Sequence, residues 1–386
     1  MEIFISAGEA SGDLHGSHLA RAIWSIAPKT HICCLGGAHM QGRGVQLIVD
    51  NRKISVVGVT EVASHIRAIY GAWAKIRSHF LVNRPALVVL IDFPDFNLLL
   101  ARFARKNGAR VFYYISPQVW GWREGRVRKI KRLVDRMAVI LPFEKQFYAS
   151  HGMDVDYVGH PLIDIMAEAP DKTKCDRLYR RSDGPVIGLL PGSRLTEIRL
   201  LFDILMEAAQ IISRSLPAAR FIMPLAPSLD PAQMQTRAAR FSLPVQIVSN
   251  DTYGAIRACD LILAASGTVT LEAAILETPM IVLYKLSKLS MRIGKMLVQT
   301  QFVGLPNLIA GRQIVPEFVG EEPTGPRLAR CALRLLTNPE LLDEQRLELK
   351  KIRNLLGAPG ISARVARLAL NTAGMTNDES GVMDNE

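Results

Sequence analysis

The stretch Val186–Arg194 reads VIGLLPGSR and joins a short apolar run to a turn that contains glycine. A second stretch of the same kind, Leu261–Ala274, reads LILAASGTVTLEAA and continues with helical spacing. An apolar run that ends in glycine just before a helix is typical of the strand–turn–helix unit of parallel α/β sheets. The second half of the chain is therefore predicted to contain at least two such units.

Both turns are suited to phosphate. The first N–H groups of a helix have no partner within the helix, and the helix dipole adds partial positive charge at the same place. Ordinary turns that carry glycine for steric reasons alone are the alternative. Two such turns in one half, one of them with an arginine, favour a diphosphate ligand. The candidate phosphate-binding residues are Gly192, Ser193, Arg194, Ser266, Gly267 and Thr268.

Short apolar runs alternate with longer amphipathic stretches along the chain. This alternation predicts the α/β class, with doubly wound parallel sheets and helices on both faces. We expect strands at 3–6, 31–35, 87–91, 111–115, 137–141, 156–158, 186–190, 220–224, 245–248, 261–264 and 280–283. A ligand of such domains is expected at the carboxyl ends of the strands, in a cleft between the two domains.

A polar segment without strand character, from about 164 to 185, predicts a domain boundary. We expect a first Rossmann-like domain over 1–168 and a second over 184–355. A further helical segment over 356–373 follows. The polar, acidic tail over 374–386 is expected to be disordered.

Composition limits the classes of partner. The 386 residues carry a formal net charge of +11, which calls for nucleic acid, an acidic membrane surface or a phosphorylated substrate. Five scattered cysteines, with Cys33 and Cys34 in an apolar run, indicate buried thiols rather than disulfides or a zinc site. We see no signal peptide and no apolar run of about 18 residues, so we expect a cytoplasmic protein.

The first predicted strand leads into SAGEASGDLHG (6–16), which offers Glu9, Asp13 and His15 to a substrate. The alternative is a simple helix start capped by Asp13. The glycines recur at every fourth residue, which is not the Gly-x-Gly-x-x-Gly dinucleotide fingerprint. A nicotinamide cofactor is therefore not expected.

The apolar run Leu87–Ile91 is followed by DFPDFN (92–97). A carboxylate just after a buried strand can have its pKa raised by desolvation and can serve as general base. Pro94 disfavours helix for Phe93, so at least one of the two aspartates should project toward a ligand. We assign the base to Asp95, for which a helix N-cap is the alternative role.

Val59–Phe80 carries apolar residues at helical spacing, with basic residues between them. Core packing is favoured by the sequence alone, and a helix on a membrane surface is the alternative. The basic stretches Arg123–Arg136 and Lys285–Val298 would attract anionic lipid, and no recognisable nucleic-acid module accompanies them. In the membrane reading, the residues facing the lipid are Ile66, Ile69, Trp73 and Ile76.

No metal site is expected from the sequence. Asp154 and Asp156 have the spacing of a cation-binding pair, but they lead directly into a strand-like segment. The eight histidines show no ligand spacing.

Eight motifs, in order along the chain, resemble those of the lipid-A-disaccharide synthase family. They are SAGEASGD (6–13), IDFPDFN (91–97), SPQVWGWR (116–123), LPFEKQFY (141–148), VGHPL (158–162), LPGSR (190–194), SGT (266–268) and GLPNLIAG (304–311). The resemblance implies a GT-B-like glycosyltransferase of two Rossmann-like domains, whose last helix returns to the first domain. It also implies the joining of UDP-2,3-diacylglucosamine to 2,3-diacylglucosamine 1-phosphate, which gives a β-1,6-linked disaccharide and UDP without a cofactor.

The resemblance also implies roles for single residues. Asp95 would take the proton of the acceptor 6-hydroxyl, and Arg194 with the turn Ser266–Thr268 would stabilise the leaving diphosphate without metal. Glu272 would accept the ribose hydroxyls. The remaining residues expected at the reacting sugars are Asn307 on the donor side and Glu9, Asp13, His15 and Asn97 on the acceptor side.

An acylated acceptor implies an enzyme on an anionic membrane, at the cytoplasmic face of the inner membrane. Association into a homodimer is left open. The rivals are another UDP-sugar enzyme of this fold, such as an undecaprenyl-linked N-acetylglucosaminyltransferase or a UDP-sugar epimerase, and a basic nucleic-acid-binding module. Because no nucleic-acid reader motif is present, we expect no nucleic-acid partner.

Overall fold

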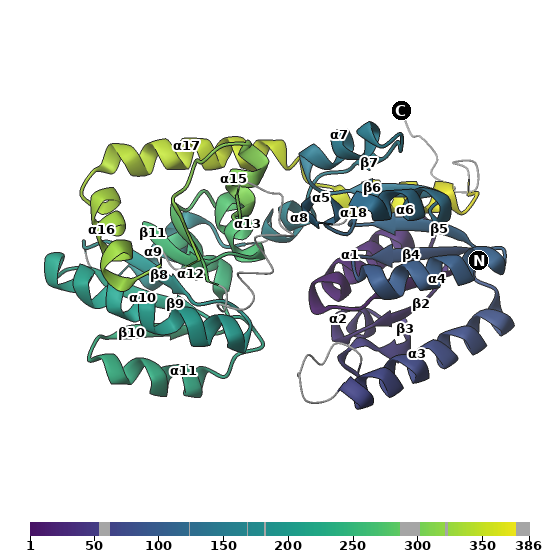
Figure 1. Ribbon diagram of the computed structural model, residues 1–386, viewed down its shortest axis with the longest axis horizontal. Helices are drawn as coiled ribbons and strands as arrows, with labels where there is room; N and C mark the ends of the chain where they lie inside the picture. Colours follow the sequence, from purple (N-terminus) through teal and green to yellow (C-terminus); the bar gives the residue numbers. More distant parts are fainter. Residues whose placement is uncertain are drawn as a thin grey trace. The chain divides into compact units, whose positions relative to one another are not determined.

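A computed structural model describes residues 1–53, 62–122, 124–167, 169–180, 183–285, 302–320 and 323–375. The chain forms two compact units (Figure 1). The first unit contains Met1–Asp164 and the segment from Ala358 onward, and the second contains Ile165–Gly357.

The first unit is built on a seven-stranded parallel sheet with the order β3-β2-β1-β4-β5-β6-β7. Its strands are β1 Glu2–Ala7, β2 His31–Gly36, β3 Gln46–Asp50, β4 Leu87–Ile91, β5 Arg110–Tyr114, β6 Arg136–Val139 and β7 Asp156–Tyr157. β1 and β4 are almost entirely buried, because both of their faces are covered by helices.

Helices α3, α4 and α6 supply one hydrophobic core of this unit, and α1 packs with α18 against the sheet as well. The helices are α1 Ala10–Ile26, α2 Ala38–Gly42, α3 Val62–Asn83, α4 Pro94–Lys106, α5 Val119–Trp122, α6 Val127–Leu133, α7 Pro142–Ser150 and α18 Ile361–Thr372, and α8 Leu162–Ala167 contains the boundary between the units. The Asp164 carboxylate holds the start of α18, since it accepts hydrogen bonds from the N–H groups of Gly360 (2.7 Å) and Ser362 (2.9 Å).

The second unit has a six-stranded parallel sheet with the order β10-β9-β8-β11-β12-β13. Its strands are β8 Val186–Leu190, β9 Arg220–Pro224, β10 Val245–Val248, β11 Leu261–Ala265, β12 Met280–Tyr284 and β13 Glu317–Val319. Its helices are α9 Lys172–Tyr179, α10 Leu195–Ser215, α11 Pro231–Ala238, α12 Thr252–Ala258, α13 Thr268–Ile275, α15 Leu305–Ala310, α16 Gly325–Leu336 and α17 Pro339–Leu355. Helices α10, α11 and α16 form one core with the sheet.

The predicted doubly wound α/β architecture is confirmed in both units. Two edge strands, β3 and β13, were not predicted, because they are short and only partly buried and so lack a continuous apolar run. The polar segment from about 164 to 185, in which we expected no strand, contains the helix α9, which packs on α12 within the second unit. Most of the predicted tail and nearly all of the basic stretch Lys285–Val298 lie outside the described residues.

Helix α3 corrects part of the predicted membrane face. Ile76 is fully buried in the core of the first unit, so the prediction that it faces lipid is wrong. Trp73 packs edge-on against Phe96 and Phe103, and Ile69 is half-buried against the same core. Their spacing of three to four residues gives one helix face, and that face covers the sheet. The side chain of Ile66 lies outside the described residues.

Candidate functional site

Each sheet has one point at which the strand order reverses, and loops at such a point diverge to leave room for a ligand. In the first unit this switch point lies between β1 and β4, and in the second it lies between β8 and β11. The predicted motifs SAGEASGD and IDFPDFN follow β1 and β4, and LPGSR and SGT follow β8 and β11. Four motifs from distant parts of the sequence therefore fall on the two switch points.

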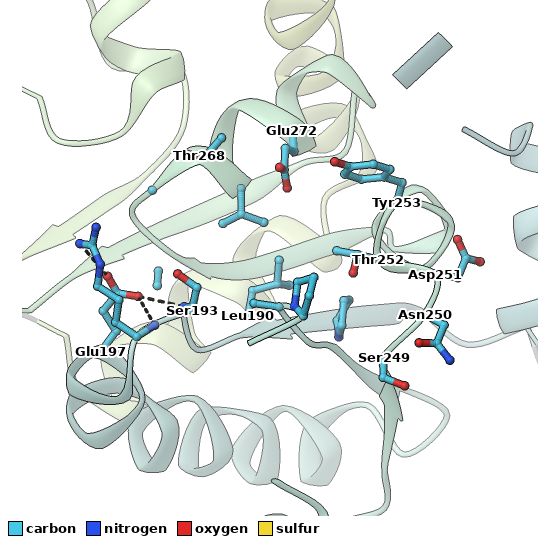
Figure 2. Close-up of a pocket in the computed structure, with 18 of the residues that line it drawn as sticks. Leu190, Ser193, Glu197, Ser249, Asn250, Asp251, Thr252, Tyr253, Thr268 and Glu272 are labelled. Atoms are coloured by element: carbon cyan, nitrogen blue, oxygen red, sulfur yellow. Dashed lines mark hydrogen bonds and ion pairs between the residues drawn. The ribbon is translucent and has the colours of Figure 1, made fainter. Parts of the chain in front are cut away.

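The switch point of the second unit opens into a pocket of about 710 Å³ (Figure 2). Residues after the carboxyl ends of β8, β9, β10 and β11 line it. They include Ser193, Arg194, Glu197, Asn250, Asp251, Tyr253, Ser266, Gly267, Thr268 and Glu272. The predicted phosphate-binding residues of both turns are thus brought to one cavity.

The first turn is already occupied by a side chain of the protein. The Glu197 carboxylate accepts hydrogen bonds from the backbone N–H groups of Ser193 (3.0 Å) and Arg194 (3.2 Å), as Figure 2 shows. Gly192 has a φ of +109°, and a Cβ there would lie 2.3 Å from a Glu197 oxygen. Two N–H groups expected to bind phosphate therefore hold an internal carboxylate. Sequence reasoning missed Glu197, although an acidic residue in a first helical turn is a recognised signal.

The second turn is open. A Cβ at Gly267 would meet nothing within 4 Å, and Gly267 and Thr268 are both exposed to the pocket. Among the described residues, the N–H groups of Thr268 and Val269 at the start of α13 donate to no protein acceptor. The Ser266 hydroxyl donates to the Val303 carbonyl (2.8 Å), which fixes the turn. This turn offers the unpaired N–H groups that an anionic ligand needs.

Glu272 lies one helical turn further along α13 and faces the pocket (Figure 2). Burial raises the pKa of its carboxyl to about 7. The pKa of Tyr253 is also raised, by burial and then by the neighbouring Glu272, toward which its hydroxyl points in Figure 2. A carboxylate in this setting can accept hydrogen bonds from ligand hydroxyls, which the low local dielectric strengthens.

Asn307 does not face the pocket as we expected. It is fully buried, its Nδ2 donates to Val315 (2.9 Å) and Glu317 (2.7 Å), and its Oδ1 accepts from the N–H groups of Ile314 and Val315. All of its hydrogen-bonding capacity is therefore used within the protein. Because Glu317 also binds the N–H group of Val303 (3.0 Å), Asn307 positions the segment that holds Ser266.

In the first unit, Asp92 occupies the switch point. Burial raises the pKa of its carboxyl to about 6, and the negative charge of Glu9 adds to the shift. Asp92 and Phe93 have φ of 44° and 48°, which side-chain-bearing residues rarely adopt. The Asp92 carbonyl is held by Asn97 Nδ2 (2.6 Å) and Tyr113 Oη (3.0 Å). Such strain, imposed by surrounding contacts, is typical of functional sites.

The setting of Asp95 differs from the one that we expected of a base. Its side chain is 79% exposed and accepts a hydrogen bond from Arg126 (2.5 Å), and it lies in the first turn of α4. Asn97 is completely buried, with its Oδ1 accepting from the Ser6 hydroxyl (2.6 Å), so it supports the loop rather than contacting a substrate. The desolvated carboxylate of the IDFPDFN motif is Asp92.

The surroundings of Asp13 and His15 indicate structural roles for both residues. Asp13 is buried and accepts hydrogen bonds from the N–H groups of Gly37 (2.7 Å) and His39 (2.8 Å), so it caps α2 rather than the helix on which it lies. Burial, with a contribution from His18, lowers the pKa of His15 to about 4. Within the described residues, His15 Nδ1 is buried without a hydrogen-bond partner. His15 is therefore a weak base near pH 7, and the Asp13 carboxylate is engaged by backbone N–H groups.

Comparisons with known proteins identify the family of the chain and its fold. The family model described as "Lipid-A-disaccharide synthetase" matches residues 3–367. A lipid-A-disaccharide synthase of Geobacter metallireducens is 42% identical over 375 residues, which cover 96% of this chain and 97% of that protein. One of Syntrophus aciditrophicus is 43% identical, over 95% of this chain and 97% of that one. An Acinetobacter baumannii MurG structure aligns with a TM-score of 0.59 at 13% identity, over 96% of this chain and 99% of its own, and shares the fold.

Proposed function

The chain belongs to the lipid-A-disaccharide synthase family, and we propose that the pocket of its second unit binds the UDP-sugar donor. It is a GT-B-fold glycosyltransferase that forms the lipid A disaccharide from a sugar nucleotide and a lipid acceptor. The donor is UDP-2,3-diacylglucosamine, the acceptor is 2,3-diacylglucosamine 1-phosphate, and the products are the β-1,6-linked disaccharide 1-phosphate and UDP.

One observation supports the donor assignment above the others: the open turn at the start of α13 with Glu272 one turn beyond it. The N–H groups of Thr268 and Val269 would bind the diphosphate, and the Glu272 carboxylate would accept hydrogen bonds from the ribose hydroxyls. The side chain of Arg194 is 76% exposed and lies 3.8 Å from a Glu197 oxygen, an ion pair that it would exchange for a phosphate, although its backbone N–H stays engaged. Charge stabilisation of the leaving diphosphate would then come from side chains and a helix start.

We assign the general base to Asp92 rather than to Asp95. In the reaction, the 6-hydroxyl oxygen of the acceptor bonds to the anomeric carbon of the donor while the bond to the diphosphate breaks. The proton of that hydroxyl goes to the Asp92 carboxylate, and UDP leaves with the bonding electrons. A carboxyl whose pKa is raised to about 6 is mostly ionised at neutral pH and is a stronger base than an exposed one.

We further propose that the protein works on the cytoplasmic face of the inner membrane. None of the described helices has the length and apolar character needed to cross a bilayer. Tyr70 on α3 is 70% exposed, and α6 exposes Arg128, Lys129 and Arg132. An exposed aromatic residue and exposed basic residues suit contact with anionic lipid headgroups. Association into a homodimer stays an open proposal.

The decisive experiment is incubation with both lipid substrates, followed by mass analysis. We expect the disaccharide 1-phosphate and one UDP per disaccharide, and we expect EDTA to leave the rate unchanged. The matched control omits the acceptor, and UDP should then not be released. Conversion of the UDP-sugar without acceptor, or loss of activity in EDTA with recovery in Mg²⁺, would contradict the proposal.

A further inference from the structure

A carboxylate, a thiol and an imidazole lie close together in the first unit, at the end of the sheet where its strands begin. Glu2 begins β1, Cys33 lies in β2, and His79 lies near the end of α3. The switch-point loops leave the sheet at its opposite, carboxyl edge, so this cluster has no part in the site described above. His31 stands beside Glu2 because the two residues are partners in the β1–β2 register.

The side-chain atoms of the cluster converge on one point. His79 Nε2 lies 2.8 Å from Glu2 Oε1 and 3.3 Å from Cys33 Sγ, and all three ligand atoms lie within 4.8 Å of one another. The second oxygen of Glu2, Oε2, lies 2.9 Å from His31 Nδ1. Cys33 is fully buried, and the side chains of Glu2 and His79 are only 11% exposed.

A hydrogen bond between Glu2 and His79 accounts for only part of this geometry. That bond uses the Nε2 position of the imidazole, yet the Cys33 sulfur approaches the same nitrogen. A sulfur, a ring nitrogen and a carboxylate oxygen that all face one point are what a divalent transition metal requires. With metal–ligand bonds of about 2.0–2.3 Å, neighbouring ligand atoms in a tetrahedral site lie about 3–4 Å apart, so small movements would suffice.

We propose that Glu2, Cys33 and His79 bind a divalent transition-metal ion of the zinc class. His31 holds the Glu2 carboxylate in place, and a water completes the four-coordinate shell. The site does not suit Mg²⁺ or Ca²⁺, because both ions prefer ligand atoms that are all oxygen. The ion would tie β1, β2 and α3 together and would stabilise the first unit rather than take part in glycosyl transfer.

Metal binding at this site has a proton balance that can be measured. A thiol without positive charge beside it keeps its proton near pH 7, since the ordinary pKa of cysteine is about 8.5. A metal ligand must be a thiolate, so the thiol proton passes to solvent when the S–metal bond forms. Nε2 must be free of its proton to bind the ion, so the N–H that donates to Glu2 in the metal-free protein is replaced by an N–H at Nδ1. One proton should therefore be released for each ion bound.

The experiment titrates the full-length protein, first freed of metal with a chelator, with Co²⁺ as a spectroscopic probe. We expect one equivalent to bind and to give a thiolate-to-cobalt charge-transfer band, which Zn²⁺ then abolishes. The test variant is Cys33→Ala, and the matched control is Cys34→Ala, because Cys34 is equally buried but points to the opposite face of β2. Cys33→Ala should lose the band and Cys34→Ala should keep it.

A second variant and a second measurement keep the proposal testable if Cys33→Ala does not fold. His79→Gln keeps the thiol and should weaken Zn²⁺ binding at least about 100-fold, since even outer-shell changes cost 10–100-fold. Calorimetry in two buffers of different ionisation enthalpy should give one proton released per Zn²⁺. Failure of the wild-type protein to bind one equivalent, or a cobalt–thiolate band that persists in folded Cys33→Ala, would overturn the proposal. Glycosyl transfer should be equal with and without Zn²⁺.

Discussion

The two switch points have the same topology and opposite chemistry. In the first unit, the loops after β1 and β4 bring together two carboxylates, Glu9 and Asp92, and the second of these is desolvated. In the second unit, the loops after β8 and β11 bring together the starts of two helices, α10 and α13. One site can accept a proton, and the other can hold an anion.

The two turns of the second unit also differ from each other. Glu197 occupies the N–H groups of the turn before α10, whereas the turn before α13 is open. A glycine-containing turn before a helix is therefore not sufficient for phosphate binding, because an acidic residue in the first helical turn can satisfy the same groups. The surroundings of each loop decide its chemistry, and the strand order decides only where the loop lies.

The sharpest test of the first switch point is Asp92→Asn. It should lower kcat by a factor of roughly 10²–10⁴, because the base for the acceptor hydroxyl is removed while the shape is kept. Donor binding, measured by calorimetry with UDP, should not change. The matched control is Asp95→Asn, which alters an exposed ion pair with Arg126. A large loss of kcat in Asp95→Asn with near-normal turnover in Asp92→Asn would reverse the assignment.

Arg194→Ala tests whether the turn before α10, whose N–H groups bind Glu197, contributes to the reaction through the Arg194 side chain. We expect kcat/KM to fall roughly 10²-fold, as when one donor to a developing negative charge is removed. Arg194→Lys should recover only part of this loss, since lysine keeps the charge but not the two-pronged geometry. Steady-state kinetics with both substrates measure the effect. Full activity in Arg194→Ala would mean that the turn before α10 has a purely structural role.

Thr268→Pro tests the open turn. Proline is tolerated at the first position of a helix, so the change deletes one backbone N–H at little cost to α13. A hydrogen bond to a charged group contributes about 1.5–3 kcal/mol, so UDP binding should weaken about 10–100-fold. Thr268→Ala removes the side chain but keeps the N–H, and it should bind UDP nearly as the wild type does. Equal weakening in both variants would show that the threonine hydroxyl, not the N–H, is the ligand.

Glu272 should make donor affinity depend on pH. Burial raises the pKa of its carboxyl to about 7 in the free protein, and the ribose hydroxyls would bind the ionised form. Below pH 7 a proton must be lost before binding, so affinity should fall by at most about tenfold per pH unit and should be constant above that pH. The UDP-sugar is the right probe, because its phosphates stay ionised throughout, unlike the terminal phosphate of UDP. Glu272→Gln should bind more weakly without this dependence, and a persistent slope would assign the titration elsewhere.

The sequence predicted the buried framework better than the side-chain settings. Strands such as Leu87–Ile91 and Leu261–Ala265 are continuous apolar runs between turn signals, and they form where expected. The general base is assigned to Asp92 instead of Asp95 because of two positive φ angles, at Asp92 and Phe93. The sequence does not indicate these angles, since neither residue is glycine. Asn307 was misread for a similar reason, because the partners that saturate its amide come from the segment Ile314–Glu317.

Helix α3 is a second case in which the sequence did not identify the contacts of a side chain. Its apolar spacing favoured a core but also fitted a membrane surface, and the rings of Phe96 and Phe103 show which surface Trp73 covers. Periodicity identifies a face of a helix but does not name the partner of that face.

The hydrogen bonds between the Asp164 carboxylate and the start of α18 join segments that are far apart in the sequence, and this matters during synthesis of the chain. The first unit includes α18, which packs on α1, yet α18 follows the whole of the second unit in the sequence. All of residues 165–357 must be synthesised in between, which takes on the order of 10–40 s at about 5–20 residues per second. During that time the nascent first unit exposes the apolar face of α1 that α18 later covers. A chain stalled before Ala358 should therefore be a substrate for chaperones, and it should be released from them once α18 is supplied.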